Sequence, residues 1–275
     1  MNALPLGANT FSYIYTDPML GALRKLAALG YRNFEILIAQ PHLWPADVSA
    51  EERRAIPRIL ADEGLKIASV NLPGIDNNIV SSTREMRAFT VDVVSALIDL
   101  CGDWRIPYLI IVPGRTMPLW PIPKAQLTEW FVEGMTTLAD RAADKGVTVL
   151  IENVPNTWIP RAADVMEALD ALGRDDVGVI YDCANAPFAG EDPVEGVHIV
   201  KDRLKLVHVS DTPKDAWRHD PIGTGDVDFA GFADALRDIG YDGETMAEII
   251  APDPDRHFAE AADRLAGAGW RCRTG

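Results

Sequence analysis

In the second half of the chain, four short runs rich in Val, Ile and Leu each have, at or near their end, a residue of a type that binds metal ions. These residues are Glu152, Asp182, His208 and Glu248. Burying three carboxylates beside apolar runs is costly unless a positive charge neutralises them. Three carboxylates with one imidazole suit a borderline or hard cation, whereas zinc more often takes thiolates or more histidines. The set predicts one divalent metal ion, with Mn²⁺ the first choice and Mg²⁺ or Co²⁺ as alternatives.

The four runs belong to an alternation that continues along the chain. Eight strand-like runs alternate with stretches of helical period, and the runs are 6–10, 33–38, 66–71, 108–112, 148–152, 178–182, 204–209 and 245–249. Apolar runs of this kind are typical of parallel strands buried on both faces. Between two of them, residues 124–145 place Leu127, Phe131 and Met135 on one helical stripe. Glycine follows several of the helical stretches, as a helix stop requires: Gly30, Gly64, Gly146 and Gly240.

Eight strand–helix units favour closure into a barrel. The rival, a doubly wound open sheet, would carry a glycine-rich phosphate loop after the first strand, but residues 9–13 read NTFSY. Since no linker interrupts the pattern, we predict an α/β fold with a single (β/α)8 TIM-barrel domain over residues 1–275. Active sites of such barrels lie at the carboxyl ends of the strands, so the four candidate ligands should meet there. The proline-rich segment 113–123 is expected to form a long loop on the same face.

Composition narrows the class of partner and the compartment. The 275 residues carry a formal charge of -15, which disfavours binding to nucleic acid. No apolar run is long enough to cross a membrane, and the first residues do not resemble a signal peptide. The three cysteines form no CxxC pair, as is common in a reducing compartment. We therefore expect a cytoplasmic protein whose partner is a small molecule.

In the four candidate metal ligands and their spacing along the chain, the sequence resembles the xylose isomerase-like barrel superfamily. The similarity extends over nearly the whole chain, is strongest over 147–250, and is closest to ketose 3-epimerases and inosose isomerases or dehydratases. The resemblance implies that the metal is held by the four strand-end residues named above. It also implies that Glu152 and Glu248 are the catalytic pair, one removing a proton and the other returning it.

The resemblance further implies contacts with a sugar-like substrate. Arg218 begins a stretch, 218–229, that is similar to the family's arginine-then-PGxG loop, and would reach substrate oxygens. Asn185 stands where many relatives have a histidine, and an amide does not titrate near neutrality. Glu35, which we expect at the end of the second strand, matches a position that often faces the substrate pocket, although a rim carboxylate or a salt bridge behind the metal ligands is an equal alternative. Trp158 on a rim loop is expected to stack on a sugar ring or to pack in the loop core.

The resulting function is a metal-dependent isomerase or epimerase that acts on a sugar or cyclic polyol ketone through an enediolate. Ketose epimerases tend to have a second glutamate shortly after the metal ligand that corresponds to Glu152. Residues 153–158 contain none, which disfavours a free ketohexose as the substrate. The alternative is a dehydratase or lyase acting on an inosose-like or oxidised (keto) glycoside substrate at the same site. Two remote alternatives are a phosphodiesterase similar to endonuclease four, which 5 histidines and the negative charge disfavour, and a non-catalytic barrel subunit. Apolar rim residues such as Trp44, Leu119 and Trp120 could cover the pocket or form a subunit interface, so a homo-oligomer is possible.

Overall fold

The computed structural model describes residues 3–272. The strands are β1 (Leu4–Asn9), β2 (Asn33–Leu37), β3 (Lys66–Leu72), β4 (Tyr108–Ile111), β5 (Thr148–Glu152), β6 (Gly178–Asp182), β7 (Leu204–Val209), β8 (Glu244–Ala247) and β9 (Trp270–Cys272). The α-helices are α1 (Met19–Ala28), α2 (Ala50–Asp62), α3 (Arg84–Trp104), α4 (Lys124–Lys145), α5 (Ala162–Leu172), α6 (Asn185–Phe188), α7 (Pro193–Val200), α8 (Phe229–Asp238) and α9 (Pro254–Ala268). Short 3-10 helices follow β1 and β2, namely η1 (Phe11–Tyr13) and η2 (Pro45–Asp47).

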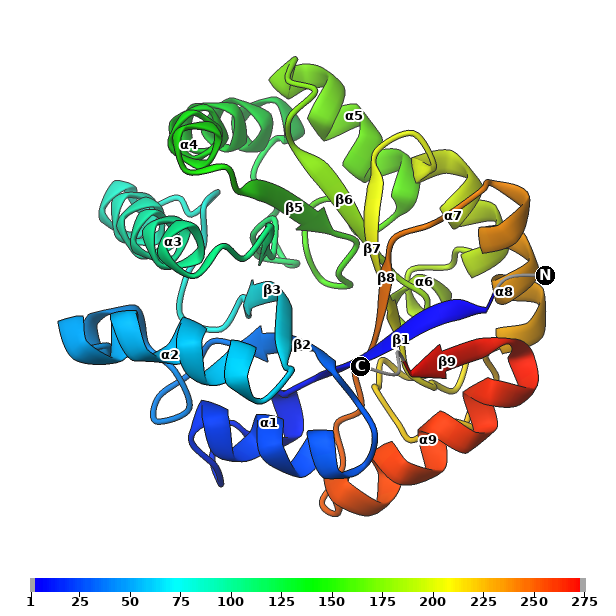
Figure 1. Cartoon of the computed structure of the whole chain (residues 1–275). Coiled ribbons are helices and arrows are strands. Elements are labelled where there is room, and N and C mark those ends of the chain that lie inside the picture. Colours follow the sequence, from blue (N-terminus) through cyan, green and yellow to red (C-terminus); the bar gives the residue numbers. More distant parts are fainter. Residues whose placement is uncertain (1–2, 273–275) are drawn as a thin grey trace.

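Within the described residues, strands β1 to β8 form a closed parallel barrel. Each strand pairs with the next along the chain, and β1 pairs with both β8 and β2 to complete the ring. The helices surround the strands (Figure 1). Strand β9 lies outside the ring, parallel to the first half of β1, where Leu4 is opposite Trp270. The (β/α)8 prediction is confirmed.

The helices form where the sequence places apolar stripes between stop and start signals. Helix α4 has the predicted bounds and buries Leu127, Phe131 and Met135 against the barrel. Gly146 ends it with φ of 66°, a backbone conformation that costs glycine little. Helix α2 starts with a capping box in which Ser49 and Glu52 bond each other's backbone N–H groups.

Two strand ends differ from the prediction, and both affect the site. Strand β8 ends at Ala247, so Glu248 lies just beyond it, although its N–H still donates to the carbonyl of Val209. Glu35 lies in the middle of β2 instead of ending it, beside a bulge in the pairing with β3. An apolar run does not show where the hydrogen bonds between strands stop, because residues just beyond the last paired position can be as apolar as those within the strand.

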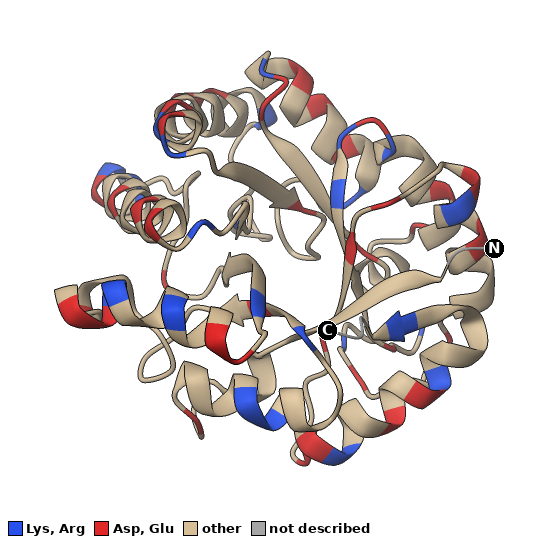
Figure 2. Cartoon of the chain, in the orientation of Figure 1, with Lys and Arg blue, Asp and Glu red and all other residues tan. Residues whose placement is uncertain are grey.

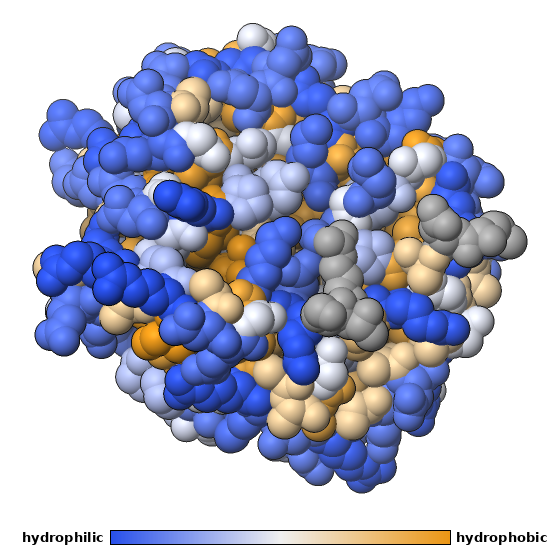
Figure 3. All heavy atoms as spheres, viewed as in Figure 1, coloured by the Kyte–Doolittle hydropathy of each residue, from blue (hydrophilic) through white to orange (hydrophobic). Residues whose placement is uncertain are grey.

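Charge is concentrated on the outer helices and loops, whereas the strands are mostly uncharged (Figure 2). On the face seen in Figure 3, hydrophilic residues occupy most of the periphery and hydrophobic residues show between them toward the middle. No helix in residues 3–272 is long and apolar enough to cross a membrane.

Candidate metal and substrate site

The four predicted ligands meet at the carboxyl ends of strands β5 to β8. Their donor atoms all lie within 4.8 Å of one another, and all four side chains are buried. The strand register brings them together: Asp182 is directly opposite His208 in the β6–β7 pair. Because neighbouring parallel strands end at the same face of the barrel, residues 26 to 40 positions apart in the chain become neighbours in space.

Glu35 fixes the orientation of His208. The Nε2 of His208 lies 2.8 Å from Glu35 Oε1, so an Nε2–H donates to this carboxylate and Nδ1 is turned toward the ligand cluster. The Nδ1 lies 3.0 Å from Glu248 Oε2 and 3.5 Å from Glu152 Oε1. Metal-binding histidines commonly donate their second ring N–H to a carboxylate in this way.

The expected substrate contact of Glu35 therefore needs correction. Its side chain is fully buried beneath the cluster and accepts hydrogen bonds from Ser69, Asn9 and Asn71 in addition to His208. Four donors converge on one carboxylate because β1, β2, β3 and β7 all direct polar side chains into the barrel at this level. Of the two alternatives, the salt bridge behind the metal ligands describes Glu35 and the rim carboxylate does not, so Glu35 acts on the site through His208.

Burial shapes the protonation of the cluster. Removal from water raises the pKa of Glu152 above the ordinary glutamate value, despite the opposing effect of His208. Burial likewise raises the pKa of Asp182. Burial alone would lower the pKa of His208, but the surrounding carboxylates, led by Glu35 and Glu248, raise it well above its ordinary value. Without a cation, the site thus holds carboxylates that resist ionisation.

The residues present fit a divalent cation. Among the described residues, none donates a hydrogen bond to Asp182 Oδ2, and none makes a well-directed hydrogen bond with His208 Nδ1 even though Glu248 Oε2 lies 3.0 Å from it; both atoms are buried. Buried polar atoms normally have partners, and both of these atoms point toward the same cluster. Three carboxylate oxygens and one imidazole nitrogen are a donor set suited to Mn²⁺ or Mg²⁺, with Co²⁺ also compatible.

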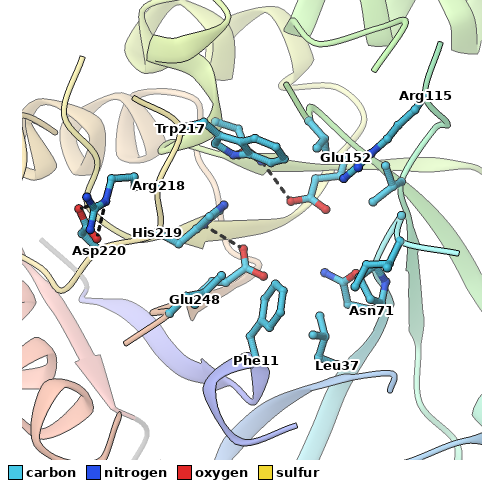
Figure 4. Close-up of a pocket in the computed structure, with 17 residues that line it drawn as sticks. Phe11, Leu37, Asn71, Arg115, Glu152, Trp217, Arg218, His219, Asp220 and Glu248 are labelled. Atoms are coloured by element: carbon cyan, nitrogen blue, oxygen red, sulfur yellow. Dashed lines mark hydrogen bonds and ion pairs between the residues drawn. The ribbon is translucent and has the colours of Figure 1, made fainter. Parts of the chain in front are cut away.

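A pocket of about 450 Å³ lies over the cluster, and we call it the inner pocket (Figure 4). Of the four candidate ligands, all in the described part of the chain, Glu152 and Glu248 line its wall. Their carboxylates point toward the same space from β5 and from the segment after β8 (Figure 4). Phe11, Leu37 and Val112 supply apolar walls. A ligand in the pocket would thus meet the two glutamates directly.

Asn185, a predicted substrate contact, does line the inner pocket. Its Oδ1 accepts a hydrogen bond of 2.6 Å from the indole N–H of Trp217, and its Nδ2 lies 3.4 Å from Glu152 Oε1. Trp217 therefore fixes the rotamer of the amide and turns its N–H₂ group toward Glu152. Trp217 was not predicted, because an aromatic residue in the loop after β7 is the only indication of it in the sequence.

Arg218 lies at the edge of the same pocket but is paired. Its Nε is 2.8 Å from Asp220 Oδ2, and 60% of its side chain is exposed. Reaching the substrate, as the resemblance implied, would require the guanidinium to leave Asp220. Arg115, from the loop after β4, also lines the pocket and was not predicted.

His219 is the third pocket residue that was not predicted from the sequence, after Trp217 and Arg115. Its Nδ1 lies 3.4 Å from Glu248 Oε2 and 3.6 Å from Asp182 Oδ2, and it bonds the hydroxyl of Ser210 at 3.0 Å. The ring also lines the inner pocket, where Figure 4 shows it directed at Glu248. A histidine within a glycine-rich loop after β7 was the available signal.

One carboxylate holds the loop that carries Trp217, Arg218 and His219. Asp211 Oδ2 accepts hydrogen bonds from the N–H groups of Gly223 and Thr224 at 2.7 and 3.0 Å. Its Oδ1 accepts a further hydrogen bond from the N–H of Val227 at 3.2 Å. Asp211 therefore fixes the return of the loop, and with it the three pocket residues.

Trp158 lies in the core rather than on the pocket wall. Only 9% of it is exposed, its ring meets Phe131 edge to face, and its N–H donates to the carbonyl of Pro113 at 2.9 Å. The proline-rich loop supplies the partner that a buried indole needs. The loop-core alternative thus describes Trp158, and the proposed stacking on a sugar does not.

The chain matches the family model described as xylose isomerase-like TIM barrel over residues 23–268. It is 29% identical to L-ribulose 3-epimerase of Methylomonas sp. (strain DH-1), over 84% of this chain and 78% of that protein. It is 26% identical to inosose isomerase of Halalkalibacterium halodurans, over 59% and 60%. Against uncharacterized protein MJ1311 of Methanocaldococcus jannaschii, at 23% identity, the match spans 65% of this chain and 63% of that protein.

Solved structures with the same fold include a D-tagatose 3-epimerase-like protein, with a TM-score of 0.84 and 19% identity, covering 96% of this chain and 97% of that one. Another is a 3-keto-D-glucoside 4-epimerase from E. coli, with a TM-score of 0.80 and 18% identity, covering 96% and 99%. These likenesses concern the barrel itself.

Proposed function

Because the chain belongs to the xylose isomerase-like TIM barrel family, we propose that it is a metal-dependent isomerase or epimerase of a sugar-like ketone, working through an enediolate. The observation that carries the proposal is that only two of the four candidate ligands, all in the described part of the chain, line the inner pocket. Glu152 and Glu248 reach the inner pocket, whereas Asp182 and His208 are buried behind them. Two carboxylates that meet one ligand from separate strands are placed to move a proton on and off the same carbon.

Each protein group has a definable task in this proposal. Glu152 and Glu248 exchange the proton, and Glu35 keeps His208 in the tautomer that presents Nδ1. Asn185 offers its N–H₂ group to a substrate oxygen, in an orientation set by Trp217. The bound cation would supply positive charge that stabilises an oxyanion next to the carbon that loses its proton.

We also propose which metal ion and which class of substrate the site takes. Mn²⁺ is our first choice of metal, for the donor set given above. A sugar 3-epimerase and an inosose isomerase among the relatives support a small polyhydroxylated ketone. Loss of a group β to the ketone uses the same proton abstraction, so a lyase acting on an inosose or a keto-glycoside is the second candidate. Asn185 in place of a titratable residue favours such oxidised substrates.

We further propose a cellular compartment, a type of partner and an oligomeric state. A charge of -15 disfavours nucleic acid, three free cysteines suit the cytoplasm, and a small molecule is the expected partner. Leu119 and Trp120 are 86% and 84% exposed in the loop after β4, a surface that a homo-oligomer could cover.

Metal content is the first test. We expect about one Mn²⁺ per chain after loading, loss of that ion in Glu152→Gln, and deuterium uptake from heavy water into ketoses, inososes or keto-glycosides. The double change Glu152→Gln with Glu248→Gln should abolish exchange while the circular dichroism spectrum is kept. A protein that binds no divalent ion, or a double variant that still exchanges protons, would refute the proposal.

A further inference from the structure

A second cavity lies beside the inner pocket, and we call it the outer cavity. Its volume is about 410 Å³, and it is bounded by Tyr15, Trp44, Phe89, Ile38, Leu72 and Val93, among others. Three of these are aromatic, and they come from three separate segments: the loop after β1, the loop after β2, and helix α3.

The alternation of two strands places the two cavities back to back. Leu37 and Asn71 line the inner pocket, and the next residue of each segment, Ile38 and Leu72, lines the outer cavity. Successive side chains of a strand point to opposite faces of the sheet. The inner pocket therefore lies inside the barrel wall, and the outer cavity lies between the wall and α3.

The two cavities share one boundary over the end of the strands. Pro73 and Ile75 line both of them. The backbone of Gly74 packs closely against Val112, since a Cβ on this glycine would lie 2.8 Å from Val112 Cγ1, and Asn77 donates to the carbonyl of Pro73 at 2.7 Å. A ligand that extends from the inner pocket into the outer cavity would pass over Pro73 and Ile75.

The outer cavity has the surface of an apolar binding site. Tyr15, Ile75 and Phe89 are 73%, 57% and 46% exposed, so large apolar side chains lie open to solvent around it. Such exposed apolar groups seldom cluster without a ligand or partner. Among the described residues, no Lys, Arg or His lines the cavity, and Asp76 does, so an anionic group such as a phosphate is disfavoured.

We propose that the outer cavity is a subsite for a neutral aromatic or apolar substituent carried by the sugar, so that the substrate is a glycoside and not a free ketose. The inference rests on the proposed function, because it assumes that the sugar occupies the inner pocket. Because Pro73 and Ile75 line both cavities, a substituent on a sugar in the inner pocket is the group placed to reach the outer cavity. Pockets for small ligands are mostly apolar, with few polar groups, as this one is.

The test compares p-nitrophenyl β-D-glucoside with methyl β-D-glucoside, which share the sugar and differ in the substituent. Neither carries a ketone, so neither turns over, and calorimetry on the Mn²⁺-loaded protein measures binding alone. We expect the nitrophenyl glucoside to bind about tenfold or more tightly, because an aromatic ring leaves water.

The double variant Tyr15→Ala with Phe89→Ala should bring the ratio of the two affinities close to unity and leave the methyl glucoside unaffected. Both side chains are substantially exposed, so the fold should tolerate their loss. Phe188→Ala is the matched control, since Phe188 is 43% exposed and lies at the end of α6; it should keep the ratio.

Equal affinities in the wild-type protein, no detectable binding of the nitrophenyl glucoside, or a preference that persists in the double variant would each overturn the inference. A dimer that dissociates in the double variant, without any preference between the glucosides, would overturn it in favour of contact with a second copy. The proposed function has a separate readout: deuterium exchange can fail while the aromatic preference holds, and the reverse is also possible.

Discussion

The indole nitrogen of Trp217 lies 2.6 Å from Asn185 Oδ1, so the loop after β7 controls an amide that belongs to the segment after β6. A free asparagine side chain can present either its oxygen or its nitrogen to a ligand. Here the oxygen is engaged, and the nitrogen is left facing Glu152. The polarity that a substrate meets at this point is decided by a residue 32 positions away in the chain.

Replacing the indole while keeping an aromatic ring tests this control. Trp217→Phe should lower kcat/KM by about threefold to tenfold, the worth of one hydrogen bond, mainly through KM. Kinetics on the best substrate from the deuterium-exchange screen measure the change. Asn185→Asp, which cannot donate to a substrate oxygen, should cost more. An unchanged KM in Trp217→Phe would show that the amide is held by other contacts.

Removing the charge of Glu35 tests its effect on His208. Glu35→Gln should weaken Mn²⁺ binding by about tenfold to a hundredfold, as for partners of metal-bound histidines. Calorimetric titration of the metal-free protein measures the affinity, and its thermal unfolding shows whether the fold survives. Ser69→Ala removes a neutral donor to Glu35 Oε2 but leaves the carboxylate and its contact with His208, so it should have a smaller effect. Equal metal affinity in Glu35→Gln and the wild type would contradict this assignment.

Metal stabilisation should depend on pH with a definite sign. The pKa of Glu152 and of Asp182 is raised in the folded, metal-free protein. Such groups stabilise the fold while protonated, and that stability is lost as pH rises through their folded pKa. Since a cation removes this penalty, the Tm increase caused by Mn²⁺ should be larger at about pH 7.5 than at about pH 5.5.

Two measurements make that comparison specific. The variant Glu152→Gln should show little metal stabilisation at either pH, because a ligand is missing. The same protocol on the wild type with Ca²⁺, a larger cation, reports whether the effect needs a particular ion. A Tm increase that is the same at both pH values would contradict the role of these carboxylates.

Trp158 should matter for stability and not for substrate binding. Trp158→Phe leaves the buried carbonyl of Pro113 without its donor, which costs about 1–3 kcal/mol. Urea unfolding measures this loss, and KM should stay within about twofold, since one hydrogen bond to substrate would be worth more than that. A large rise in KM with unchanged stability would restore the original interpretation of Trp158 as a sugar contact.

The barrel and the gathering of the four candidate ligands could be predicted because both follow from the ends of apolar runs. A parallel barrel brings strand ends together whatever the loops do, so Glu152 and Asp182 needed no knowledge of loop conformation. The roles of Glu35 and Trp158 could not be predicted in this way. Glu35 contacts His208 across 173 positions, and the partner of Trp158 is a carbonyl in a loop with no periodic pattern.

Trp217 and His219 fall between these cases. Both residue types are visible in the sequence, but their direction depends on how the loop after β7 returns. That return is set by three backbone N–H groups donating to Asp211. Backbone donors leave no trace in residue type, so the sequence shows which side chains are available and not which of them face the pocket.

The contact between Glu35 and His208 also limits how such a barrel can be divided into halves. All four candidate ligands come from β5 to β8, so a fragment with only the second half-barrel would contain the complete donor set. It would lack β2, and His208 would lose the acceptor for its Nε2–H. A half-barrel of this chain would therefore carry the ligands without their alignment. The site belongs to the closed ring, and duplication or recombination of half-barrels would have to supply an acidic partner from the other half.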